Sequence, residues 1–143
     1  MKPFNLLLVE DNEGDIILTI EAFEEAGIAN KINVARDGEQ AVKLLQNCIR
    51  ENSSELPDII ILDVNLPKMN GHEVLRYIKM HEKLKHIPVL MLTTSSSERD
   101  INESYRNFAS CFITKPVEIN EFVKVVQKIE MFWLSIVQLP RRN

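Results

Sequence analysis

Residues 59–63 read Ile-Ile-Ile-Leu-Asp, four branched apolar residues followed at once by a carboxylate. Similar short apolar runs occupy residues 6–9, 89–92 and 111–113, and a weaker one occupies residues 32–35. Runs that are apolar throughout, rather than alternating with polar residues, are typical of strands covered by helices on both faces. The sequence therefore predicts five parallel strands in one sheet buried between two layers of helices.

Segments with the period of amphipathic helices separate these runs. They cover residues 15–25, 37–50 and 71–84, and the last begins at about residue 119. Asp37 is a suitable N-cap for the second of them, and Ser95 with Glu98 resembles a capping box for a further helix. Strands alternating with helices give five β/α repeats, an α/β chain of the (βα)5 doubly wound type.

The length of 143 residues fits one globular domain. A hydrophobic fraction of 45% and a charged fraction of 27% are those of an ordinary folded α/β protein. No linker or shift in composition divides the chain. We therefore expect a single domain over residues 1–143, with an ordered core at about residues 4–130, a C-terminal tail at residues 134–143, and no output domain.

Charge and hydropathy bear on location and partners. The net charge of −4 disfavours nucleic acid, since domains that bind it usually carry a basic surface. No apolar run approaches the roughly 18 residues that a membrane span needs. The N-terminus runs directly into acidic residues and does not resemble a secretory signal. We expect a cytoplasmic protein that contacts neither nucleic acid nor membrane.

Polar residues follow four of the predicted strands. Glu10 and Asp11 follow the first, Asp63 the third, Thr93 the fourth, and Lys115 the fifth. Open parallel sheets bind their ligands beyond the carboxyl ends of the strands, at the point where strand order reverses. The sequence therefore brings acids, a hydroxyl and a cation together at one edge of the sheet.

The three carboxylates of Glu10, Asp11 and Asp63 would repel one another unless a cation lay between them, and a set of oxygen ligands suits Mg²⁺. Such an ion would orient Asp63 as a nucleophile for a phosphoryl group. Thr93 and Lys115 would contact the phosphoryl oxygens, since catalysis of phosphoryl transfer is mostly positioning and charge stabilisation. The expected product is an acyl phosphate on Asp63.

Five motifs in order resemble the signature blocks of response-regulator receiver domains. They are LVEDN at residues 8–12, ILDVNLP at 61–67, Asn70-Gly71, LTTS at 92–95 and TKP at 114–116. The resemblance extends over about residues 4–127. It implies the flavodoxin-like receiver fold with strand order 2-1-3-4-5, and a two-component switch whose Asp63 accepts phosphate from a sensor histidine kinase.

The resemblance also implies roles for single residues. Asn65 would offer its backbone carbonyl to the Mg²⁺ held by the acidic residues. Apart from the resemblance, the side-chain amide of Asn65 could orient an attacking water, and we therefore expect slow loss of the phosphate. Thr93 would move onto the phosphoryl group, and Phe112 would turn inward with it as the switch aromatic. A cis peptide is implied between Lys115 and Pro116.

A narrower resemblance rests on residues 65–68, on residues 92–95, and on the chain ending at residues 132–134 and 139–140. These segments are similar to small single-domain regulators that pair with phytochrome-like sensor kinases. Members of that group self-associate through the region of the fourth and fifth helices. The resemblance therefore implies a phytochrome-like kinase as partner and a homodimer through that region.

Two alternatives remain open. Phosphatases of the haloacid-dehalogenase type also use an aspartate nucleophile, but they need a second aspartate two residues later, where this chain has Asn65. A receiver-like adaptor that is never phosphorylated is the other. We expect no enzymatic turnover beyond self-catalysed phosphorylation and its slow reversal. The histidines His72, His81 and His86 are expected on solvated helix surfaces.

Overall fold

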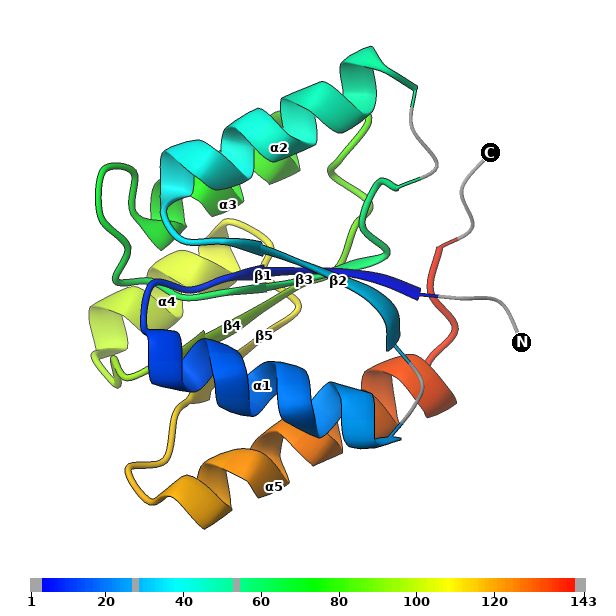
Figure 1. The fold of residues 1–143 in the computed structure, drawn as a ribbon. Coiled ribbons are helices and arrows are strands. Elements are labelled where there is room, and N and C mark those ends of the chain that lie inside the picture. The colour runs from blue at the N-terminus through cyan, green and yellow to red at the C-terminus, as the bar shows by residue number, and fades with distance from the viewer. Residues whose placement is uncertain (1–3, 27–28, 53–54, 141–143) are drawn as a thin grey trace.

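The computed structural model describes residues 4–26, 29–52 and 55–140. Within them, parallel strands form a sheet of order β2-β1-β3-β4-β5, as Figure 1 shows. The strands are β1 (Phe4–Val9), β2 (Ala29–Ala35), β3 (Ile59–Leu62), β4 (Val89–Thr93) and β5 (Cys111–Thr114). The predicted doubly wound (βα)5 architecture and its strand order are confirmed.

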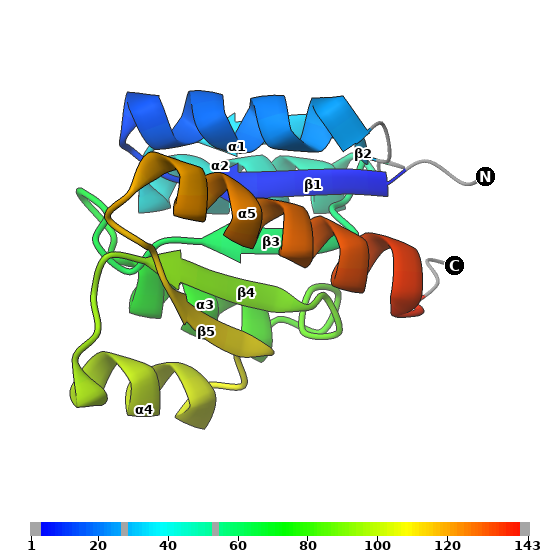
Figure 2. The same cartoon turned by 90° about the horizontal axis from the view of Figure 1, so that it is seen from below.

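Helices cover both faces of the sheet (Figures 1 and 2). On one face lie α1 (Glu13–Ala26) and α5 (Ile119–Ile129), and on the other lie α2 (Gly38–Arg50), α3 (Gly71–Met80) and α4 (Glu98–Arg106). None of these helices is long and apolar enough to cross a membrane, among the residues that the structure describes.

The two layers explain why the buried parts of the strand sequences are apolar. Successive strand residues point to opposite faces, so Leu7 and Val9 enter the core beneath α2 and α3, while Leu6 and Leu8 enter the core beneath α1 and α5. All four are at most 2% exposed. Strand residues that are buried in this way are therefore apolar, whichever face they point to, whereas the outer strand β2 also carries Lys31 and Asn33.

Side-chain caps fix where α2 and α4 begin. Asp37 accepts a hydrogen bond from the Gln40 N–H at 2.8 Å at the start of α2, as predicted. The prediction for α4 is wrong, because Ser97 is its N-cap and accepts from the Asp100 N–H. Ser95 lies too early to cap the helix and instead donates its hydroxyl to the Asp100 side chain.

The end of α3 differs from the prediction. The third helix ends at Met80 rather than near residue 84, because His81 has an extended backbone conformation. Leu84 lies in the turn that follows and is fully buried. Its apolar side chain belongs to the core but does not extend the helix.

The chain does not become a tail at residue 134. Seven residues of π-helix, η1 (Glu130–Ile136), continue from α5. The wider π turn places Leu134 five residues after Ile129 on the same buried side, and both are at most 5% exposed. Trp133 packs against the core beneath α1 and α5, whereas Phe132 is half exposed. Residues 141–143 of the predicted tail lie outside the described residues.

Gly71, the first residue of α3, lies directly against the strand end that carries Asp63. A Cβ atom placed on Gly71 would overlap the Asp63 carbonyl oxygen and lie 2.7 Å from the Val64 Cα atom. The Gly71 N–H also donates to the Val64 carbonyl at 2.8 Å. Only glycine allows the helix to begin this close to the residue after β3.

We predict that Gly71→Ala lowers the free energy of unfolding by about 1–3 kcal/mol, the usual cost of overpacking against atoms that cannot move aside. Urea unfolding of the variant measures this. Gly14→Ala is the matched control, because a Cβ there meets only the Asn12 side chain at 3.3 Å. Equal stability of the Gly71 variant and the wild type would show that this contact yields easily.

Candidate functional site

Backbone pairing brings the ends of β1 and β3 together. Glu10 follows β1, and its N–H donates to the Ala35 carbonyl at 3.0 Å. Asp63 follows β3, and its N–H donates to the Val9 carbonyl at 3.1 Å. Because these bonds continue the sheet by one residue, both carboxylates emerge at the same edge.

Three carboxylates gather at this edge. Glu10, Asp11 and Asp63 each offer an oxygen atom, and these atoms all lie within 4.8 Å of one another. Glu10 and Asp63 are 3% and 5% exposed, whereas Asp11 is open to solvent. A cluster of oxygen ligands with one open side fits a hard divalent cation that keeps some of its water. The cluster could therefore bind a divalent metal ion.

The Lys115 ammonium group lies among these acids. Its Nζ atom donates to Glu10, to the Asp15 carboxylate at 3.0 Å and to the Asp63 carboxylate at 3.3 Å. The lysine side chain is only 4% exposed. A buried ammonium group needs such partners, since removing a charge from water is costly.

Burial and charge change the proton affinities of this group. Burial raises the pKa of Glu10 to about 7; the Asp63 charge adds to this increase, while the hydrogen bond from Lys115 opposes it. Burial alone would lower the pKa of Lys115, but the hydrogen bond to Glu10 and the nearby carboxylates hold it above its usual value. The lysine therefore remains cationic within the cluster.

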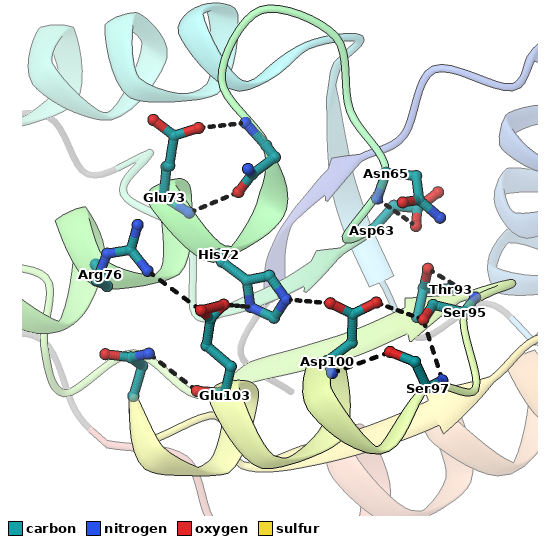
Figure 3. Close-up of polar contacts among 12 residues, drawn as sticks. Asp63, Asn65, His72, Glu73, Arg76, Thr93, Ser95, Ser97, Asp100 and Glu103 are labelled. Atoms are coloured by element: carbon teal, nitrogen blue, oxygen red, sulfur yellow. Dashed lines mark hydrogen bonds and ion pairs between the residues drawn. The ribbon is translucent and has the colours of Figure 1, made fainter.

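Thr93 ends β4 beside this cluster. It is fully buried, and its hydroxyl oxygen accepts a hydrogen bond from the Ser95 N–H at 3.3 Å (Figure 3). Its carbonyl accepts from the Lys115 N–H at 2.6 Å, so the two residues are joined through the backbone. The structure thus brings together the carboxylates, hydroxyl and lysine that the sequence singled out.

Asn65 and Phe112 lie at the border of the site. The Asn65 N–H donates to the Asp63 carboxylate at 3.2 Å, and the Asn65 side chain is exposed. Phe112 is partly buried and packs against the core beneath α2 and α3. Its N–H, on the edge strand β5, donates to the Tyr105 hydroxyl oxygen at 3.1 Å.

The predicted cis peptide between Lys115 and Pro116 is wrong. No peptide bond is cis within residues 4–26, 29–52 and 55–140. The trans form of an X-Pro bond is intrinsically favoured by about 0.5–1 kcal/mol.

Two participants were missed from the sequence. The sequence assigns Asp15 only to the start of a helix, yet its carboxylate, in the first turn of α1, reaches Lys115. His72 was expected in solvent, but it is 6% exposed and lies between α3 and α4.

Comparison with known families agrees with this geometry. The response regulator receiver domain matches residues 6–127 of the chain. The chain belongs to this family.

Relatives of this family resemble the chain over most of its length. The response regulator Rcp1 of Synechocystis sp. is 42% identical over 138 residues, which cover 96% of this chain and 94% of Rcp1. A probable methanogenesis regulatory protein, FilR2 of Methanothrix harundinacea, is 40% identical over 139 residues, which cover 96% of this chain and 88% of the relative. The chain resembles phytochrome-associated regulators of this receiver family.

Solved structures give the same result. The Mn²⁺-bound form of Rcp1 superposes with a TM-score of 0.91 at 43% identity, over 97% of this chain and 100% of that one. The phosphorylated cyanobacterial phytochrome response regulator RcpA superposes with a TM-score of 0.92 at 40% identity, over 98% of this chain and 100% of that one. One of these relatives thus carries a divalent ion and the other a phosphoryl group.

We predict that Lys115→Met lowers the free energy of unfolding by about 3 kcal/mol or more without divalent ions, because the buried carboxylates lose their partner. Saturating Mg²⁺ should reduce this loss, since a bound cation replaces the missing charge. Urea unfolding with and without Mg²⁺ measures both effects. Lys124→Met is the matched control: its side chain is 63% exposed, and we expect a change below about 0.5 kcal/mol. A Lys115 variant as stable as the control would contradict the prediction.

Proposed function

We propose that this protein accepts a phosphoryl group from a sensor histidine kinase onto Asp63 in a Mg²⁺-dependent reaction. The observation that carries the proposal is the buried Asp63 carboxylate, which shares a metal-suited cluster with Glu10 and Asp11 and contacts the Lys115 ammonium group. Membership of the receiver family supports the same reaction.

In the proposed step, a carboxylate oxygen of Asp63 attacks the phosphorus atom of a phosphohistidine. A new O–P bond forms, the N–P bond breaks, and the histidine leaves with its electron pair and takes up a proton. Lys115 already lies 3.3 Å from the Asp63 carboxylate and can shift to the phosphoryl oxygens as the transfer proceeds. Positioning and charge stabilisation of this kind account for most catalysis of phosphoryl transfer.

Mg²⁺ would be held by the carboxylates of Glu10, Asp11 and Asp63 and by the backbone carbonyl of Asn65. When bound, it would offset the negative charge of the acids and of the phosphoryl oxygens. The acidic cluster of this chain and the Mn²⁺ in the related Rcp1 support a divalent ion at this position.

Phosphorylation would then change the surface of the protein. The Thr93 hydroxyl would turn to a phosphoryl oxygen, and Phe112 would turn inward as the switch aromatic. The exposed amide of Asn65 would orient a water molecule, so that phosphate is lost slowly. The signal would then pass to a partner by protein contact or by relay of the phosphate. Such switches work because a local change of charge shifts the protein surface from one of two states to the other.

The partner kinase is proposed to be phytochrome-like, and the protein to act in the cytoplasm. The similarity to RcpA, a phytochrome response regulator, supports this partner. A net charge of −4 argues against nucleic acid as a ligand.

A homodimer through the region of α4 and α5 is proposed as well. Large apolar side chains are exposed there: Tyr105 is 49% exposed, Phe108 75% and Ile119 62%. Exposed apolar groups of this size are typical of interaction surfaces when they lie together. Sedimentation velocity at increasing protein concentration measures this association, and a monomer at every concentration would contradict it.

We predict that the wild type gains the mass of one phosphoryl group when incubated with Mg²⁺ and acetyl phosphate, and that Asp63→Asn gains none. Intact-mass spectrometry measures both, and decay after removal of the donor gives the lifetime. The same sample should not hydrolyse a phosphomonoester. An unmodified wild type would favour the adaptor alternative, and steady phosphomonoester turnover would favour the phosphatase.

A further inference from the structure

His72 is a buried imidazole that has no part in the phosphoryl transfer described above. It occupies the second position of α3, is 6% exposed, and faces α4 (Figure 3). A polar side chain that is buried between two helices must obtain its hydrogen bonds from them. Its neighbours therefore decide what it does.

Two carboxylates of α4 meet the two nitrogen atoms of His72. Nε2 lies 2.8 Å from an oxygen of Asp100, and Nδ1 lies 3.3 Å from an oxygen of Glu103. The second contact has ion-pair distance without hydrogen-bond geometry, so Nδ1 is left without a hydrogen-bond partner. An imidazolium ion presents an N–H toward both acids, whereas neutral imidazole turns a lone pair toward one of them. His72 therefore holds Asp100 through Nε2 and lies against Glu103 through Nδ1.

The Asp100 carboxylate connects His72 with the segment between β4 and α4. Its other oxygen accepts the Ser95 hydroxyl at 2.5 Å, while the Ser95 N–H donates to the Thr93 hydroxyl oxygen at 3.3 Å. The hydrogen bond from Ser95, followed by that from His72, lowers the pKa of Asp100. Asp100 thus remains an anion shared between α3 and the residue that holds Thr93.

The backbone segments that carry His72 and Ser95 are themselves held in place. Gly71, next to His72, packs against the Asp63 carbonyl and cannot be moved without moving that strand end. The Ser95 carbonyl in turn accepts the Thr114 hydroxyl at 3.2 Å. The chain His72–Asp100–Ser95 therefore ties the Thr93 hydroxyl to the helix that begins at the phosphorylation site.

His72, Asp100 and Glu103 line a groove of about 770 Å³, and other charged residues line it as well. Arg76 of α3 lies 4.0 Å from Glu103 and balances part of its charge. Arg99 of α4 and Asp11 of the acidic cluster also line the groove. Of these groups, only Asp100 and Glu103 are within ion-pair distance of His72.

We propose that His72 and Asp100 are positioning residues that hold Ser95, and through it the Thr93 hydroxyl, in the unphosphorylated arrangement. This inference rests on the proposed function, in which Thr93 must leave Ser95 to reach the phosphoryl group. By holding Asp100, His72 slows phosphorylation of Asp63. Loss of this contact loosens the connection and speeds the reaction.

The first test replaces His72. His72→Gln keeps a hydrogen-bond donor but has no charge, so we expect phosphorylation by acetyl phosphate to become about fivefold faster at pH 6, a coupling of ordinary size. His72→Arg keeps a cation and should stay close to the wild type at this pH. His86→Gln is the matched control, because His86 is an exposed histidine outside the connection.

The second test compares these two variants with each other. The contact with Asp100 predicts a faster rate in His72→Gln and a rate near the wild type in His72→Arg. A merely structural role of His72 would change the rate of both variants alike.

The third test asks whether His72 acts through Asp100. The side chains of His72 and Ser95 come from different segments, and both contact Asp100. Ser95→Ala and His72→Gln should therefore each speed phosphorylation. Because both variants break the same connection, the double variant should be little faster than either. Circular dichroism checks folding. Asp100→Asn, nearly isosteric and 26% exposed, replaces His72→Gln if that variant does not fold.

The outcomes separate the inference from the function on which it rests. A wild type that gains no phosphoryl mass overturns both. A wild type that is phosphorylated, but whose rate His72→Gln and Asp100→Asn leave unchanged, overturns the positioning role alone. Additive effects of the Ser95 and His72 variants also overturn it.

Discussion

The site depends on the ion pairs between the Lys115 ammonium group and the buried carboxylates. Parallel strands force Glu10 and Asp63 to the same edge of the sheet, and burial there leaves their charges poorly screened by water. Lys115 reaches both, as well as Asp15, from the end of β5. One cation thereby offsets the repulsion between the buried carboxylates that follow β1 and β3.

Much of this arrangement could be predicted from the sequence, because two strong constraints act on it. Strands buried on both faces must be apolar throughout, which marks residues 59–62 and their counterparts as a parallel sheet. Parallel strands must also present their carboxyl ends together, which gathers Asp63, Thr93 and Lys115. Neither inference needs any knowledge of how a side chain is turned.

The remainder depends on packing that a linear pattern does not record. Whether His72 is solvated or buried depends on how α3 and α4 pack against each other, and neither helix sequence records that packing. The cap of α4 was placed at Ser95 because a hydroxyl three residues before an acid fits the cap pattern. Ser97 fits the same helix better, and Ser95 then becomes available for Asp100.

The hydrogen bond between the Phe112 N–H and the Tyr105 hydroxyl has a consequence for behaviour in crowded solution. β5 is an outer strand of the sheet, and unpaired N–H groups on such a strand invite a strand of another molecule to add to it. Tyr105 occupies one of these donors from α4. The Tyr105 hydroxyl thus leaves one backbone donor fewer for a strand of another molecule, which disfavours aggregation through this edge of the sheet.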